Sequence, residues 1–207
     1  MTADGWNHNT HYHDTLLTAV PRPCRRALDV GCGLGGFARR LATVADQVDA
    51  IDIDAEVVAR ARGRSAGIPN VRWIVGDFTA WAPDAAYDFV SMVATLHHLP
   101  FAGTLRKVEG LLRPGGVLAV LGLDRASSWL AAGARSALAF PVSGYYRLTR
   151  RSSGVGAAIR EPRKTLGEIA REAAQVLPGA TIRRHLLWRH SLVWVKPAAP
   201  GEPVAPR

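Results

Sequence analysis

An acidic residue followed by closely spaced glycines is the pattern with the clearest chemical meaning in this chain. Asp29 lies two residues before Gly31, and Gly33 and Gly36 complete a Gly-x-Gly-x-x-Gly spacing. A short apolar strand is expected over 27–30, directly before the turn. Glycine permits both a sharp turn and the close approach of a ligand, because it has no Cβ. The pattern therefore predicts a nucleotide-sized site between a strand and a helix.

Two classes of ligand use such a site, and the glycines alone do not separate them. Asp52 lies about 20 residues beyond the turn, where a dinucleotide site has its ribose-binding acid. However, a dinucleotide's pyrophosphate would pass close to Asp29 and be repelled by that carboxylate, whereas a ligand with a free amino group would be attracted to it. We therefore favour a cationic ligand over a nicotinamide dinucleotide.

The residues from Asp29 to Gly33 read Asp-Val-Gly-Cys-Gly, which resembles the first motif of class I S-adenosylmethionine-dependent methyltransferases. The resemblance covers roughly residues 10–196 and includes Asp52, Gly76-Asp77 and a Pro-Gly-Gly turn, in that order. It implies an α/β fold, a doubly wound, seven-stranded and mostly parallel sheet with an antiparallel last strand. It also implies S-adenosyl-L-methionine as the cofactor and S-adenosyl-L-homocysteine as the product.

The resemblance further implies cofactor contacts along the chain. Asp52 would accept hydrogen bonds from both ribose hydroxyls, and Ile53 would face the adenine. Asp77 would accept from the adenine amine, with Phe78 or its neighbours against the ring. Tyr12 is the candidate for the methionine carboxylate. The expected cofactor-binding residues are Tyr12, Asp29, Gly31, Cys32, Gly33, Asp52, Ile53, Asp77, Phe78 and Ala94.

Simpler roles remain open for several polar residues. A Gly-Asp pair after a strand, such as Gly76-Asp77, is commonly only a turn, and Asp54 fits the N-cap of the helix that follows it. His8, His11 and His13 have a borderline spacing for metal binding. Because no obvious carboxylate or cysteine partner follows them, we expect no metal. They either make polar contacts to cofactor or acceptor or belong to a solvated cap.

The loop after the strand expected over 87–93 carries the candidates for catalysis. Methyl transfer requires alignment of the reactants and exclusion of water, and a hydroxyl acceptor also needs a base. A neutral histidine suits that task near pH 7, so His98 is the first choice and His97 the second. Alternatively, both hold the loop by hydrogen bonds. The loop lacks the Asn/Asp-Pro-Pro-aromatic sequence typical of enzymes that methylate planar nitrogens, which argues against base methylation.

Hydrophobic periodicity and capping signals predict the remaining elements. Strands are expected over 47–53, 71–75, 117–121, 181–188 and 190–196, and helices over 37–45, 55–64 and 166–176. Arg39 and Arg40 are expected to face out from the first of these helices. A further helix carries Leu105, Val108, Leu111 and Leu112 on one face, and Arg113-Pro114-Gly115-Gly116 after it is expected to be a tight turn.

The length of 207 residues predicts one domain over 1–196, with a helical N-terminal cap over 1–26 and a disordered tail over 197–207. A lid insertion over 125–164, after the fifth strand, includes an apolar helix over 129–140. Two cysteines, no apolar run long enough for an integral membrane segment and no secretory signal are typical of a cytoplasmic protein.

The charge of the chain is concentrated in its last third. Residues 1–124 carry 12 Lys and Arg against 13 Asp and Glu, whereas residues 125–207 carry 14 against 4. This basic segment either holds an acidic substrate, a membrane surface or a partner, or reflects an arginine-rich composition alone.

Three functions stay open. The first is a methyltransferase of a small molecule, such as a specialised metabolite, with O-methylation slightly preferred. The second is a methyltransferase of a peptide, protein or RNA held by the basic third, and the third is a cofactor-binding partner protein without catalysis. The sequence does not predict the oligomeric state.

Overall fold

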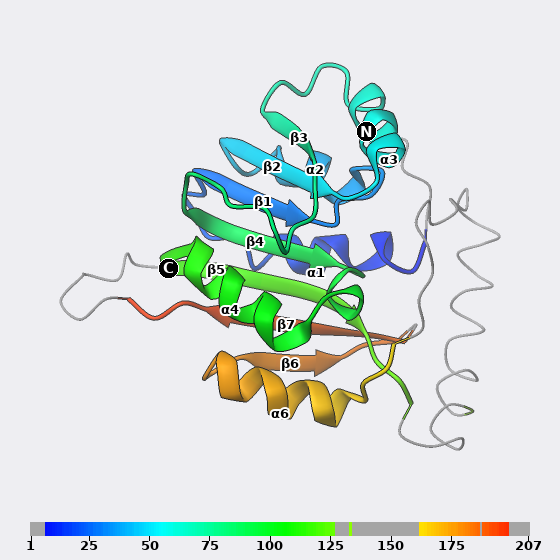
Figure 1. The fold of residues 1–207 in the computed structure, drawn as a ribbon, viewed down its shortest axis with the longest axis vertical. Coiled ribbons are helices and arrows are strands. Elements are labelled where there is room, and N and C mark those ends of the chain that lie inside the picture. Colours follow the sequence, from blue (N-terminus) through cyan, green and yellow to red (C-terminus); the bar gives the residue numbers. More distant parts are fainter. Residues whose placement is uncertain (1–6, 127–132, 134–161, 187, 199–207) are drawn as a thin grey trace.

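A computed structural model describes residues 7–126, 133, 162–186 and 188–198. Seven strands form one sheet in the order β3-β2-β1-β4-β5-β7-β6 (Figure 1). β7 runs antiparallel to both of its neighbours, and the other adjacent strands are parallel. The strands are β1 (Arg26–Val30), β2 (Gln47–Asp52), β3 (Val71–Val75), β4 (Tyr87–Val93), β5 (Leu112–Leu123), β6 (Thr181–Arg184) and β7 (Arg189–Val195). The predicted fold class is confirmed.

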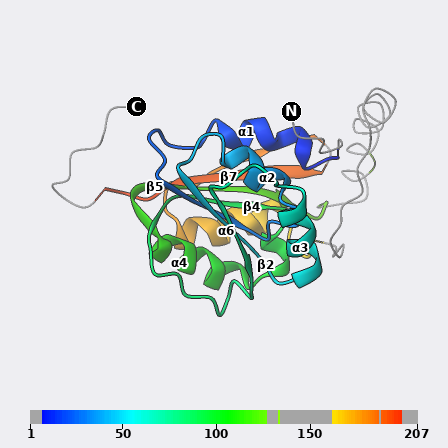
Figure 2. The ribbon, with the colours of Figure 1, turned by 90° about the horizontal axis from the view of Figure 1, so that it is seen from above.

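Helices cover both faces of the sheet, with α1 and α2 on one side and α4 and α6 on the other (Figures 1 and 2). One apolar cluster includes Leu16 and Phe37, and a second includes Leu105 and Leu177. The helical segments are η1 (Thr10–Tyr12), α1 (His13–Leu17), α2 (Gly36–Leu41), α3 (Ala55–Gly63), η2 (Leu96–His98), α4 (Phe101–Leu111) and α6 (Leu166–Val176). No helix in the described ranges is long and apolar enough to span a membrane.

The strand order places the reversal of the chain between β1 and β4. From β1 the chain moves outward through β2 to β3 and then returns to β4 on the other side of β1. Ligands bind in open α/β sheets beside the carboxyl ends of the strands at such a reversal. The loops that follow β1 and β4 are therefore the expected position of a site.

The predicted N-cap at Asp54 is confirmed, and a second helix also begins with a side-chain cap. The Asp54 carboxylate caps α3, because its Oδ1 accepts hydrogen bonds from the backbone amides of Glu56 at 2.9 Å and Val57 at 3.1 Å. Thr165 and Glu168 form a capping box at the start of α6. These signals are local, so neighbouring residues suffice to predict them.

The expectation that Arg39 faces solvent is wrong. Its side chain is buried, and Nη1 donates to the Leu34 carbonyl at 2.8 Å and lies 3.3 Å from Ser65 Oγ. The guanidinium thereby satisfies a carbonyl beside the glycine turn. The helix also ends at Leu41, earlier than expected.

The segment expected as a tight turn before the fifth strand is part of that strand. β5 begins at Leu112, which was expected in the preceding helix. Gly115 has a φ of +75°, and its amide donates to the Lys196 carbonyl at 2.9 Å. The segment therefore pairs with the residue that directly follows β7. β6 ends at Arg184, so the predicted strand over 181–188 was too long. The apolar helix expected over 129–140, most of the lid and the tail lie outside the described residues.

One buried carboxylate links the four parallel strands of the first half of the sheet. Asp49 on β2 accepts from Arg72 Nε on β3 at 2.7 Å, from Arg26 Nη2 on β1 at 3.1 Å and from the Tyr87 hydroxyl on β4 at 2.6 Å. Burial alone would raise the pKa of Asp49, but the hydrogen bonds from Arg72 and Tyr87 hold it below its ordinary value.

We predict that Asp49→Asn lowers the free energy of unfolding by about 2 kcal/mol at neutral pH, because two guanidinium groups lose their carboxylate. A depressed pKa stabilises the fold above the ordinary value and loses that contribution as the pH falls through the folded value. Urea unfolding at neutral and at acid pH should therefore show a difference that shrinks in acid. Exposed Asp46→Asn is the control, and a difference independent of pH would contradict the assignment.

Candidate active site

The glycine turn after β1 is held by packing from two directions. Gly31, Gly33 and Gly35 all have positive φ values, of +67°, +52° and +76°. A Cβ on Gly31 would overlap the Thr95 side chain, and a Cβ on Gly35 would overlap the Trp73 ring. At Gly33 an added Cβ would have no heavy atom within 4 Å. Packing thus fixes the two outer glycines, while the backbone angle alone requires glycine at the middle one.

Asp52 joins this turn to the end of β2. Its Oδ2 accepts from the Gly33 amide at 2.8 Å, and its Oδ1 accepts from the Asp54 amide at 3.1 Å. The backbone amides of Gly31 and Cys32 donate to the Ile51 carbonyl at 2.8 and 3.1 Å. Asp29 and Asp52, the two acids predicted for the site, therefore lie at the ends of the adjacent strands β1 and β2. The Asp52 carboxylate lies beside Gly33, the glycine of this turn with the most space around it.

Two apolar side chains stand exposed at this edge of the sheet. Ile53, directly after β2, is 72% exposed, and Val75, the last residue of β3, is 52% exposed. Both belong to the few large apolar residues on the surface of the described chain. Ile53 is thus accessible to a ligand, and its contact to an adenine stays a prediction.

The turn after β3 makes its own hydrogen bonds. Asp77 is exposed, and its Oδ1 accepts from the amide of Thr79 at 2.7 Å and from its hydroxyl at 2.8 Å, which lowers the pKa of Asp77. Phe78 is buried in the core cluster that also contains Leu105. Lys107 lies over the Phe78 ring at 4.9 Å and donates to the Phe78 carbonyl at 2.6 Å. Asp77 therefore holds the turn after β3, and its contact to an adenine stays a prediction.

Asp29 lies inside the protein beneath the glycine turn. Its side chain is only 1% exposed, and its Oδ1 accepts from the Ser91 hydroxyl at 2.7 Å. Burial, with a smaller contribution from the charge of Asp52, raises the pKa of Asp29 to about 7, against the hydrogen bond from Ser91. The carboxylate is thus poised between its two protonation states near neutral pH.

The loop after β4 lies beside the glycine turn, at the point where the strand order reverses. Ala94 has a φ of +53°, unusual for a residue with a side chain, and its amide donates to the Leu121 carbonyl at 2.7 Å. Thr95 then packs against Gly31, and η2 follows with His97 and His98, whose ring centroids lie 4.0 Å apart. Strain of this kind occurs at functional sites more often than elsewhere.

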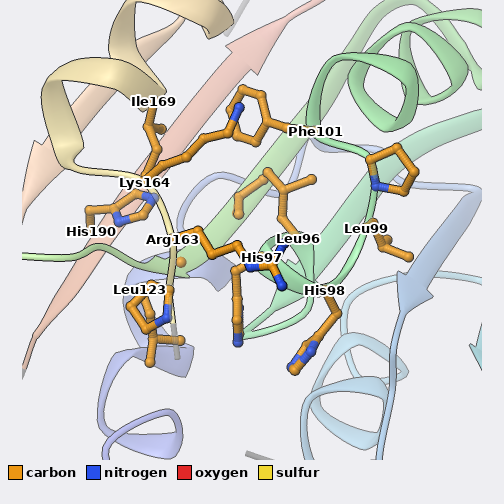
Figure 3. A pocket seen from close by; sticks show the side chains of 14 residues that line it. Leu96, His97, His98, Leu99, Phe101, Leu123, Arg163, Lys164, Ile169 and His190 are labelled. Atoms are coloured by element: carbon orange, nitrogen blue, oxygen red, sulfur yellow. The ribbon is translucent and has the colours of Figure 1, made fainter. Parts of the chain in front are cut away.

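A cavity of about 360 Å³ adjoins this loop; we call it the acceptor cavity (Figure 3). Its wall combines apolar side chains with basic ones, and no acidic residue of the described chain lines it. The lining residues are Leu96, His97, His98, Leu99, Pro100, Phe101, Val120, Gly122, Leu123, Pro162, Arg163, Lys164, Ile169 and His190. The structure thus brings both predicted catalytic histidines to one cavity.

Tyr12 packs against the connection between β6 and β7 and belongs to the same apolar cluster as Cys32 of the glycine turn. It is buried, its hydroxyl donates to the Leu186 carbonyl at 3.0 Å, and its ring centroid lies 5.0 Å from that of His185. A contact from Tyr12 to a bound ligand would require exchange of the bond to Leu186.

Sequence reasoning missed two residues of the acceptor cavity region. His190 on β7 lines the cavity, and its Nδ1 lies 3.4 Å from Oδ1 of Asp124, which follows β5. These residues are far apart in the sequence and meet only because β5 and β7 pair. The one available signal was a polar Arg-His-Ser start on a strand whose other residues are apolar.

Comparison with known proteins agrees with this geometry. A sequence model described as a methyltransferase domain matches residues 27–116, which extend from β1 into β5. An uncharacterized methyltransferase of Mycobacterium tuberculosis is 39% identical over 204 residues, covering 93% of this chain and 98% of that protein. The chain therefore belongs to the class I S-adenosylmethionine-dependent methyltransferase family.

Two further proteins extend the comparison. The trans-aconitate 2-methyltransferase of Methylobacterium radiotolerans is 36% identical over 107 residues, which are 51% of this chain and 41% of that protein. The crystal structure of the N-methyltransferase NodS from Bradyrhizobium japonicum, in complex with S-adenosyl-L-homocysteine, shares the fold. It superimposes with a TM-score of 0.62 at 14% identity, covering 91% of this chain and 87% of that one.

We predict a characteristic pH dependence for Asp29→Asn. A carboxyl whose pKa is raised on folding destabilises the fold progressively as the pH rises from its ordinary value of about 4 towards about 7. The amide removes this penalty and retains an acceptor for Ser91. Stability of the variant relative to the unmodified protein should therefore improve with pH over this range, by up to about 4 kcal/mol for three pKa units.

Denaturant unfolding across this pH range measures the difference. Asp54→Asn serves as the control, since asparagine is an equally good N-cap. A difference between Asp29→Asn and the unmodified protein that stays constant with pH would contradict the raised pKa.

Proposed function

We propose that this protein transfers a methyl group from S-adenosyl-L-methionine to a small molecule, with oxygen slightly preferred as the acceptor atom. The observation that carries the proposal is the adjacency of the glycine turn and the acceptor cavity. Thr95 packs on Gly31 at one end of the loop after β4, while His97 and His98 line the cavity at the other end.

The residues of the turn fit the cofactor that the family uses. Asp52 would take the ribose hydroxyls while it still accepts from the Gly33 amide, since a carboxylate has about four lone-pair sites. The exposed side chain of Ile53 would cover one face of the adenine, and Asp77 would accept from its amine. Asp29, once ionised, would attract the ligand's amino group through the turn. When bound, the cofactor supplies a methyl group and keeps the electron pair of its broken C–S bond on sulfur.

The size and lining of the acceptor cavity support a small acceptor. A volume of about 360 Å³ lies within the range of small-molecule sites, which are mostly apolar with a few placed polar groups. The trans-aconitate methyltransferase is a relative that acts on a small organic molecule. The cavity's histidines and basic residues suit an acceptor that carries negative charge or develops it during the reaction.

A hydroxyl acceptor would lose its proton to a side chain of this cavity. His98 is the first candidate and His97 the second, because both line the cavity from the loop beside the glycine turn. The close approach of their two rings, with centroids 4.0 Å apart, disfavours charging both together. At most one of them is expected to hold the transferred proton.

We predict that S-adenosyl-L-methionine and S-adenosyl-L-homocysteine bind with micromolar affinity and that Asp52→Asn weakens both by roughly ten-fold or more, because a neutral amide loses the charge-assisted bonds to the ribose. Isothermal titration calorimetry measures both ligands, with NAD as the competing class. Asp54→Asn, two residues away, is the matched control and should bind normally. Preference for NAD, or equal binding by both variants, would refute the proposed cofactor site.

A further inference from the structure

A buried histidine on β7, His190, lines the acceptor cavity and lies beside Asp124, which does not line it. His190 is 2% exposed and Asp124 is 4% exposed. His190 Nδ1 lies 3.4 Å from Asp124 Oδ1 and makes no hydrogen bond to a described residue in this arrangement, so the ring has to turn slightly before Nδ1 can donate to that carboxylate. In the view of Figure 3 the His190 ring lies at the left of the cavity and His98 at the lower right.

Gly122 makes room for this histidine. Gly122 on β5 is the register partner of His190 on β7, and it also lines the acceptor cavity. The Nε2 and Cε1 atoms of the imidazole occupy the place that a Cβ of residue 122 would take. Any side chain at this position would displace the ring. Nδ1 is on the side of the ring that faces Asp124. The edge that carries Nε2 lies against Gly122, which lines the cavity.

We propose that His190, rather than His98 or His97, is the catalytic residue that accepts the proton of the acceptor's hydroxyl, at Nε2, and that Asp124 is its positioning residue. This inference rests on the proposed function and deepens it. Asp124 holds the proton on Nδ1 and so leaves the lone pair on Nε2. The hydroxyl O–H bond breaks, its electron pair stays on oxygen, and its proton moves to Nε2. The buried carboxylate then stabilises the imidazolium that forms.

The charged surroundings narrow the class of acceptor. His97, His98, Arg163 and Lys164 line the same cavity, although Lys164 is also paired with Glu172. Arg189 precedes His190 on β7, and Arg184, the last residue of β6, is the register partner of His190. These positive groups stabilise an oxyanion on the acceptor, but they oppose a positive charge on His190. An acidic hydroxyl therefore suits the cavity best, because it gives up its proton most easily. With its apolar wall, the cavity fits a phenol or an enol rather than an aliphatic alcohol.

The first test reads the proton position without any acceptor. Nitrogen NMR of the full-length protein, with its histidines isotopically labelled, is recorded at mildly basic pH. The spectrum should show neutral His190 with its proton on Nδ1. Asp124→Ala should move that proton to Nε2. A proton on Nε2 in the unmodified protein, or the same spectrum in Asp124→Ala, would overturn the assignment.

The second test uses 4-nitrophenol, whose anion absorbs visible light, with S-adenosyl-L-homocysteine present. At about pH 6 the unmodified protein should raise the anion's absorbance at least about three-fold more than Gly122→Ala. This variant keeps His190, but its added Cβ occupies the space that the imidazole fills. Gly167→Ala is the matched control, because a Cβ there has no heavy atom within 4 Å. Equal absorbance from all three proteins would overturn the proposal.

Calorimetry with S-adenosyl-L-homocysteine on the same proteins separates this inference from the proposed function. Gly122→Ala and Asp124→Ala should bind it as the unmodified protein does. Absence of binding in the unmodified protein would refute the proposed function and leave the tautomer result standing. Normal binding with the wrong tautomer would refute only the role of His190.

Discussion

The bond from Asp52 to the Gly33 amide is the interaction on which the geometry of the site depends. It ties the end of β2 to the middle of the glycine turn after β1, at 2.8 Å. Gly33 is the glycine of this turn that no side chain confines, so this bond fixes the part of the turn that packing leaves open. The same carboxylate also holds the Asp54 amide and thereby leads the chain into the capped start of α3.

Packing from the neighbouring strands completes what that bond begins. Thr95, after β4, and Trp73, within β3, each fill the space that a side chain would need at Gly31 and Gly35. The turn is therefore shaped from both sides of the chain reversal. The same loop that supplies Thr95 carries His97 and His98 into the acceptor cavity, so cofactor and acceptor positions are coupled through a few residues. This coupling matters because methyl transfer depends on alignment of the reacting atoms.

Local signals in the sequence were sufficient for much of this structure. β3, β4 and α6 have the predicted bounds, and Asp54 and Thr165 cap the predicted helices, since each of these features depends on residues a few positions apart. The fold class followed from the motif order. The cofactor-binding and catalytic roles of individual residues stay predictions, which the geometry accommodates to different degrees.

Features that depend on distant residues were not predictable. Arg39 was expected at the surface, but the Leu34 carbonyl and Ser65 give its guanidinium buried partners. The meeting of His190 with Asp124 depends on the register of β5 and β7 and on the absence of a side chain at Gly122. No short window of sequence contains that information.

A crystal structure of the protein with S-adenosyl-L-homocysteine would test the central claim most directly. We expect both ribose hydroxyls within hydrogen-bonding distance of Asp52, the adenine against Ile53, and the sulfur directed towards the acceptor cavity. A ligand bound elsewhere, or a ribose that does not contact Asp52, would contradict that claim.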